Sequence, residues 1–336
     1  METRLNSHNK LINQIITINK ILLGVGLMIF MTGVLYGKKT STQQNYSISG
    51  YIQFLYTYDF RAFEVPNNEF QIQRGRVRLK SSIVDNILGI VEIDCGQGEL
   101  TVKDIGIEYD ALSFLNFFVG QHKMPFSREE LRSASKLLVI DRGEVNAIFN
   151  DYGYLGRDIG ITVYGQVGKN NYPLNYALGV FNGSGYKVAG DVDNAKQFVE
   201  RLVFGPVGDV SIGISSTQRS DAVIHDAMIA YGADFLFQQK GITVEGEVLT
   251  GNTEPGITMA GGNITGSYRI GPFEPAVKLE RLYPDARETG DYVSVIMLNL
   301  GWYFLKKIRL QTDLMTSMAQ GQASYRIIAA QLQTEF

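Results

Sequence analysis

The sequence contains one cysteine, Cys95, and three histidines in 336 residues. A single thiol cannot form an internal disulfide and has no thiol partner for a metal site, which excludes a disulfide scaffold and a zinc cluster. His8 lies near the start of the chain, and His122 and His225 are far apart in the sequence. The sequence therefore offers few candidate residues for histidine-dependent catalysis. The sequence therefore predicts no metal, no cofactor and no enzyme.

Basic residues are not in excess. The chain has 31 Lys and Arg against 34 Asp and Glu, so it lacks the basic surface that nucleic-acid binding requires, and no nucleic-acid partner is predicted. Hydrophobic residues make up 45% of the chain, which excludes a disordered protein. The composition leaves the fold class open.

Long hydrophobic runs are also scarce, and the main one occupies residues 21–36. It is about 16 residues long, whereas a spanning helix needs roughly 20. Because Lys10 and Lys20 precede it, the run has the order of a secretory leader, with a membrane anchor as the alternative. We expect residues 1–37 to be a secretory signal segment, cleaved anywhere from Gly33 to Ser47, and residues 38–336 to form the mature chain.

After Gln44, polar and apolar residues alternate with a period of two between breaks rich in Gly, Asn, Asp and Pro, which is typical of strands joined by hairpins. No amphipathic helix is predicted there. About sixteen strands are expected, an even number as bacterial barrels require. They span 46–58, 69–83, 86–95, 100–110, 114–123, 157–167, 174–183, 195–204, 209–218, 228–238, 241–251, 259–270, 274–283, 291–304, 307–317 and 324–336.

The connections between these strands alternate in length. Tight turns are expected near Asp85, Ala111, Gly205, Gln239, Gly271 and Lys306. Longer, more polar connections are expected at 60–68, 184–194, 220–227, 252–258 and 284–290, and the longest spans residues 124–156. Short periplasmic turns alternating with longer outer loops are typical of an all-β, transmembrane antiparallel β-barrel, and we expect residues 38–336 to form such an outer-membrane β-barrel pore. A soluble β-sandwich or β-helix does not explain this alternation.

The C-terminal segment 324–336 places Ile328, Leu332 and Phe336 on one face of a strand, and Gln331 and Gln333 on the other. The apolar face is expected to contact outer-membrane lipid. A strand that ends in Phe resembles the last strand of bacterial outer-membrane barrels, which implies recognition of the strand ending at Phe336 by the barrel-assembly machinery.

A row of four cations lies on the second expected strand. Arg74, Arg76, Arg78 and Lys80 occupy alternate positions, so their side chains leave one face, about 6.6 Å apart along the strand. A charge at bilayer depth on the lipid face costs about 2–4 kcal/mol, so this cation row is expected to face the lumen. Rows of Arg and Lys select anions in pores, and the planar guanidinium matches phosphate oxygens, which favours an anion pathway.

Four carboxylates support a second interpretation of the cation row. Glu92 and Asp94, then Asp104 and Glu108, share one face of the next two strands by the same count. They form an acidic wall that can pair with the cations as a structural cross-strand ladder. Selectivity follows the local potential along the water path and not the net charge of −3, so a general or weakly cation-selective porin stays an alternative.

The long connection carries further cations among carboxylates. They are Arg128, Arg132 and Arg142, with Lys123 and Arg157 at its two ends. We expect these five residues to belong to the anion pathway. The alternative is that the mixed charges form an ordinary solvated loop surface.

The segment FFVGQHKMPFSREELRSASKLLVIDRGEVNAIF, followed by GRDIGITVYG, resembles the phosphate-selective porin O and P family. The resemblance rests on VGQHKMPF at 119–126, on IDR at 140–142 and on GRDIG at 156–160, and it extends over residues 46–170. It implies a sixteen-stranded, homotrimeric pore for small anions such as phosphate, with the long loop folded into the lumen. His122 stands where the family more often has an aromatic residue, and no second basic row is found downstream.

Two rival functions exist for such a barrel. A barrel enzyme would use His with Ser or Asp, and an adhesin or structural barrel would carry several long outer loops, whereas only one is expected here. The expected function is passive diffusion of small anions across the bacterial outer membrane.

Overall fold

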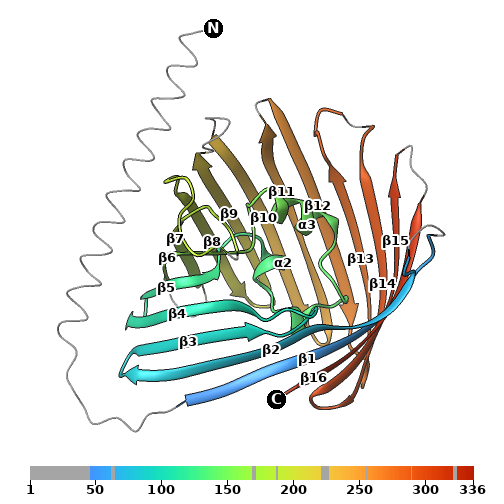
Figure 1. The fold of residues 1–336 in the computed structure, drawn as a ribbon, viewed down its shortest axis with the longest axis horizontal. Helices are drawn as coiled ribbons and strands as arrows, with labels where there is room; N and C mark the ends of the chain where they lie inside the picture. Colours follow the sequence, from blue (N-terminus) through green and yellow to red (C-terminus); the bar gives the residue numbers. More distant parts are fainter. Residues whose placement is uncertain are drawn as a thin grey trace.

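The computed structural model describes residues 46–61, 65–168, 172–186, 188–220, 227–254, 256–288, 290–320 and 324–336. In it, sixteen antiparallel strands form a closed barrel, with each strand beside its neighbours in the sequence (Figure 1). The strands are β1 (Tyr46–Asp59), β2 (Asn68–Val84), β3 (Ile87–Asp94), β4 (Thr101–Leu112), β5 (Leu115–Lys123), β6 (Arg157–Val167), β7 (Leu174–Phe181), β8 (Gln197–Val207), β9 (Val210–Ser220), β10 (Ala227–Gln239), β11 (Ile242–Glu254), β12 (Ile257–Tyr268), β13 (Phe273–Tyr283), β14 (Val293–Leu305), β15 (Ile308–Ala319) and β16 (Tyr325–Glu335). The predicted fold class and strand number are confirmed. The predicted secretory segment, residues 1–37, lies outside the described residues.

The barrel closes between its first and last strands. Tyr51 of β1 lies opposite Glu335 of β16, and the backbones of Gly50 and Phe336 donate hydrogen bonds to each other, at 3.2 and 3.0 Å. Closure leaves no strand edge, so backbone N–H and C=O groups at bilayer depth find their partners within the sheet.

Side chains alternate between the two faces of the wall. On β16, Ile328, Leu332 and Phe336 are 42%, 44% and 50% exposed, whereas Gln331 and Gln333 are 1% and 3% exposed. The apolar residues therefore face outward and the glutamines face inward, as the period-two count predicts.

The tight turns lie within a few residues of the predicted positions, but one predicted long connection is wrong. β11 runs to Glu254 and β12 begins at Ile257, so residues 252–258 do not form a long loop. The side chain of Asn252 accepts a hydrogen bond from the backbone N–H of Ile229 and donates one to the carbonyl of Ala227. These bonds tie the end of β11 to β10, and strand pairing continues through a register shift at Asn252 and Glu254.

The connection between β5 and β6, residues 124–156, contains α2 (Arg128–Leu131), the 3₁₀ turn η1 (Ala134–Lys136) and α3 (Glu144–Asp151), so the expectation of no helix is wrong. Val145 and Phe149 lie one turn apart on α3 and are both fully buried. An eight-residue helix gives too few turns for its period to be recognised in the sequence. No helix among the described residues is long and apolar enough to cross a membrane.

The main apolar core lies between this connection and the inner face of β10–β13. Val145, Phe149 and Tyr154 pack in one cluster with side chains of the wall that include Leu249 and Met259. Both of these occupy inward-facing positions, and Figure 1 shows α2 and α3 within the ring of strands. The connection therefore covers part of the inner wall.

Candidate functional site

The cation row on β2 faces the barrel interior, as the sequence predicts. Arg76 lies opposite Asp94 of β3, and Arg78 lies opposite Glu92. Leu79, which lies between Arg78 and Lys80, is 40% exposed on the outer face. The alternation of β2 thus separates the charged and the apolar residues of this segment onto opposite faces of the wall.

The row is paired with the acidic wall. Arg76 Nε lies 2.9 Å from a carboxylate oxygen of Asp94, and an Nη atom of Arg78 lies 3.2 Å from oxygens of both Glu92 and Asp104. Lys80 Nζ lies 2.7 Å from Glu108. The ladder that the sequence left as an alternative is therefore present, and each of these cations has at least one carboxylate partner.

Exposure distinguishes the two signs of charge in this ladder. The side chains of Arg78 and Lys80 are 39% and 40% exposed, whereas those of Glu92, Asp104 and Glu108 are 11%, 12% and 19% exposed. The carboxylates are set into the wall, and the two cations extend further toward the water. Arg76 differs from both, since its side chain is only 12% exposed.

A polar cavity of about 390 Å³ lies along the ladder. Its charged lining consists of four cations, Arg76, Arg78, Lys123 and Arg157, and three carboxylates, Glu92, Asp104 and Glu108. Arg157 comes from the far end of the long connection, yet its Nε lies 2.7 Å from Asp104 of β4. The structure therefore brings the strand cations and the two residues that flank the loop into one site with a small positive excess.

Lys123 and Arg142 hold the beginning and the middle of the long connection together. Both pair with the buried carboxylate of Glu130, at 3.4 and 3.3 Å, and Arg142 also donates to the backbone carbonyls of Glu129 and Arg132. Burial raises the pKa of Glu130, but the positive charges of Arg142 and Lys123 outweigh this effect. The pKa of Glu130 therefore lies below its ordinary value. This carboxylate stays ionised as the centre of the loop's internal cluster.

The other predicted loop cations lie away from the cavity. Arg128 Nε is 2.7 Å from Asp234 of β10, and Arg132 pairs with Glu245 of β11. Arg74 reaches the loop from β2 and lies 2.9 Å from Asp141. These three pairs connect the loop to the wall on two sides.

Sequence reasoning missed the charged residues of the facing wall that hold the loop. Lys278 of β13 is fully buried, and its Nζ donates to Glu129 at 2.6 Å and to the carbonyl of Arg142 at 2.8 Å. Glu247 of β11 accepts hydrogen bonds from the Ser127 hydroxyl and the backbone N–H of Arg128. The signal in the sequence was the alternation of charge at positions 245 and 247 and at 278 and 280, which the interpretation did not use.

Glu280 of β13 belongs to the same set of anchors. Its carboxylate accepts the backbone N–H groups of Glu144 and Val145, at 2.8 and 3.1 Å, in the first turn of α3. A carboxylate at this position satisfies N–H groups that have no partner inside the helix and interacts favourably with the helix dipole.

His122 is part of the packing and not an additional cation. Its ring lies between Phe118 and Phe181, with centroid distances of 4.4 and 5.0 Å. The two ring nitrogens contact the carbonyl of Gly120 and the hydroxyl of Thr162. The residue therefore fills an aromatic position in the inner wall, in agreement with the aromatic residue that is more common there in the family that the sequence resembles.

A family model for the phosphate-selective porins O and P matches residues 49–219, about half of the chain. No curated protein matches the sequence. The matched segment contains the whole cation row, the acidic wall and the long connection.

Three solved structures share the fold at 10–13% sequence identity. An anion-selective porin from Comamonas acidovorans superposes with a TM-score of 0.65 at 11% identity, covering 88% of this chain and 100% of that one. The channel DcaP of Acinetobacter baumannii gives 0.64 at 13% identity, covering 89% and 99%. The trimer form of OmpT from Vibrio cholerae gives 0.63 at 10% identity, covering 88% and 100%. At such identities these likenesses show the fold.

Proposed function

The chain belongs to the phosphate-selective porin O and P family, and we propose that it passes phosphate-like anions along the water-facing side of the ladder on β2, β3 and β4. The protein is an outer-membrane porin, and small anions are the solutes of its family. What we propose beyond this is the preferred solute, phosphate-like anions, and the side chains that contact it.

The observation that carries the proposal is the unequal exposure of the two signs of charge. Arg78 and Lys80 reach the water with about two fifths of their side-chain surface, and the carboxylates that pair with them stay largely covered. An anion that diffuses along this wall meets the cations first. The guanidinium of Arg78 offers planar, paired donors that match the oxygens of phosphate, and the ammonium of Lys80 offers a compact second charge.

The other predicted cations have different roles in this proposal. Arg76, Lys123 and Arg157 line the same cavity and raise its potential from more covered positions. Arg74, Arg128, Arg132 and Arg142 are committed to the loop, which they hold against the wall. The loop thereby limits the open cross-section to the part of the lumen beside the cation row.

The alternative is a general or weakly cation-selective porin. It is favoured by the presence of three carboxylates in the cavity beside four cations, since the residual charge of the lining is small. A pore lined by nearly balanced charges would discriminate weakly between ions of either sign.

Several further properties belong to the proposal. We propose a non-enzymatic pore, because family and fold both point to diffusion. A homotrimer is supported by the trimer form of OmpT, and recognition by the barrel-assembly machinery is supported by the outward-facing Phe336 on the last strand. Export by a secretory signal in residues 1–37 is supported by the order of charged and apolar residues there.

The test is the reversal potential of the purified protein in a planar bilayer under a potassium chloride gradient. An anion preference is expected, and phosphate added to both sides should reduce the chloride current because it occupies the same cations. A second measurement uses the double variant Arg78→Glu and Lys80→Glu, which should lose anion preference and phosphate block together. Cation preference of the unchanged protein, or chloride current indifferent to phosphate, contradicts the proposal.

A further inference from the structure

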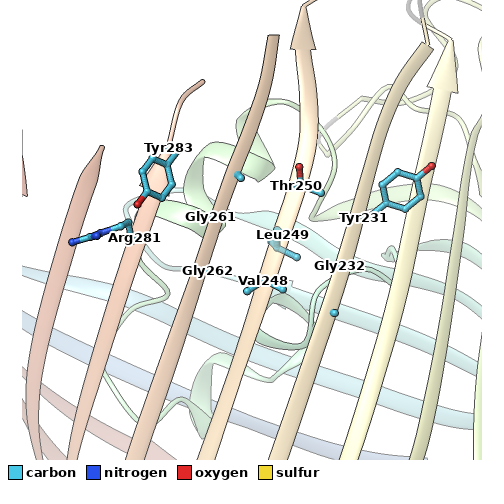
Figure 2. A pocket seen from close by; sticks show the side chains of 11 residues that line it. Tyr231, Gly232, Val248, Leu249, Thr250, Gly261, Gly262, Arg281 and Tyr283 are labelled. Carbon is cyan, nitrogen blue, oxygen red and sulfur yellow. The ribbon is translucent and has the colours of Figure 1, made fainter. Parts of the chain in front are cut away.

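A hollow of about 540 Å³ lies on the outer face of the barrel over β10 to β13 (Figure 2). Its lining includes Ala233, Thr250, Ala260 and Gly262. These occupy outward positions, because they alternate with inward residues such as Leu249, which is buried in the core cluster. Short side chains on the three adjacent strands β10, β11 and β12 thus leave a depression beside β13, and the four strands span about 14 Å, since neighbouring strands lie about 4.8 Å apart.

The hollow faces the hydrocarbon of the membrane. Val248 and Tyr231, which line it, are 62% and 58% exposed. An outward surface of this kind on a membrane barrel is covered by acyl chains. The hollow is therefore an apolar depression on the lipid-facing surface, and its shape is set by the small residues at its floor.

The rim of the hollow at Tyr283 lies at the end of the strands that bears the long connections. Tyr283 is the last residue of β13, on the side of the barrel that carries the long connections, and Arg281 lies two residues before it, about 7 Å along the strand. Tyr283 and Tyr292 are in contact, with ring centroids 6.1 Å apart. Tyrosine gathers at the membrane interface, where its ring is covered and its hydroxyl is hydrated.

Arg281 brings an uncompensated positive charge to this rim. It is exposed, its Nε donates to the Ser294 hydroxyl at 3.1 Å, and its guanidinium lies 4.5 Å from the centre of the Tyr292 ring. Within the part of the chain that the structure describes, no carboxylate pairs with Arg281 and its terminal nitrogens have no hydrogen-bond partner. Arg287, in the connection that follows, pairs instead with Asp285 at 2.8 Å.

We propose that this hollow is a binding site for an anionic, phosphate-bearing lipid of the outer leaflet, with an acyl chain in the depression and a headgroup phosphate on Arg281. The planar, paired donors of a guanidinium fit a phosphate, and the pair would satisfy terminal nitrogens that the protein leaves open. The Tyr292 ring, which also contacts Tyr283, holds the guanidinium at the rim of the hollow.

Charge complementarity favours a lipid over the other candidate occupants. A second copy of the chain that covered the hollow would bury Arg281 with no carboxylate partner within the described residues of its own chain, which is costly. Free phosphate would contact Arg281 but leave the apolar depression unfilled. A lipid satisfies the charge and the apolar surface at once.

Native mass spectrometry of the detergent-purified protein tests the site, with bisphosphorylated lipid A as the probe and phosphatidylcholine as the neutral comparison. One tightly retained lipid A per chain is expected. Arg281→Gln removes the charge and should weaken retention about tenfold, the effect of losing a hydrogen bond to a charged group. Ala233→Phe fills the depression and should weaken retention because it displaces the acyl chain. The matched controls Arg287→Gln, in the outer connection, and Ala330→Phe, on the outer face of β16, should retain lipid A as the unchanged protein does.

Three results overturn the inference. Equal retention of phosphatidylcholine, whose phosphate is balanced by choline, and lipid A would remove the role of the net negative charge, and unchanged retention in both site variants would place the lipid elsewhere. Dissociation of an oligomer by Ala233→Phe would assign the hollow to a second copy of the chain. Chloride conductance should be the same in all four variants, so this test and that of the anion pathway fail independently.

Discussion

Arg78 offers the sharpest test of how charge is used in this pore. The change Arg78→Gln removes the guanidinium but leaves Glu92 and Asp104 with partners, because both also pair with Arg157, at 3.5 and 2.7 Å. The carboxylates are therefore not left buried and alone, and the barrel is expected to fold. The charged lining of the cavity falls from four cations and three carboxylates to three of each.

The size of the effect follows from the exposure of Arg78. Two unit charges 4 Å apart in water interact by about 1 kcal/mol, which changes the local concentration of a monovalent anion roughly fivefold. The 39% exposed side chain justifies the aqueous value rather than that of a protein interior. We expect the ratio of chloride to potassium permeability to fall about fivefold in Arg78→Gln, and to fall further in Arg78→Glu.

Reversal potentials in planar bilayers measure this ratio, and repeating them at higher salt should reduce the difference as the charges are screened. The matched comparison is Lys136→Gln, which removes a 63% exposed cation of the loop that pairs with Glu335 outside the cavity. An unchanged permeability ratio in Arg78→Gln would show that the ladder is only wall structure. An equal loss in Lys136→Gln would show that total charge, and not position, governs selectivity.

Substitutions at three further positions separate structural roles from conduction. Arg76→Gln should lower the midpoint of urea unfolding, because Asp94 loses the cation that holds it and a broken buried pair costs about 3–5 kcal/mol; a midpoint equal to that of Arg78→Gln would contradict this. Lys278→Met leaves Glu129 without its cation, so the loop should loosen and single-channel conductance should rise and become noisier, whereas an unchanged trace would mean that the other anchors suffice. His122→Phe should fold and conduct normally, whereas His122→Ala should lower the free energy of unfolding by about 3 kcal/mol, the effect of an unfilled aromatic site. Loss of selectivity in His122→Phe would instead assign the ring a role in conduction.

The wall of the barrel was predictable because it depends on local pattern. Alternation alone placed Arg76 and Arg78 inside and Leu79 outside, and the same count on the next strands identified Glu92 as a partner. Strands that pair in a meander are also consecutive in the sequence. The cross-strand partners can therefore be found by counting alternate residues along the chain.

The interior could not be predicted in the same way. Lys278 contacts Glu129 across 149 residues, and that meeting depends on barrel diameter and on how the loop turns inside, neither of which the local pattern contains. His122 shows the same limit at short range, since the sequence does not show that Phe118 and Phe181 enclose its ring and make it part of the packing. The long connection predicted at 252–258 was wrong for a different reason. Asn is common in turns, but the side chain of Asn252 accepts a hydrogen bond from the adjoining strand.

The shared carboxylates of the ladder also constrain how this pore can evolve. Asp104 and Glu92 each serve both Arg78 and Arg157, so a mutation that alters one cation changes the surroundings of the other. A change of preferred solute during evolution would therefore require paired substitutions among Arg78, Glu92, Asp104 and Arg157, in which one change offsets the charge altered by another. We expect them to covary among relatives, with the charge of the group conserved more strongly than the identity of any one member.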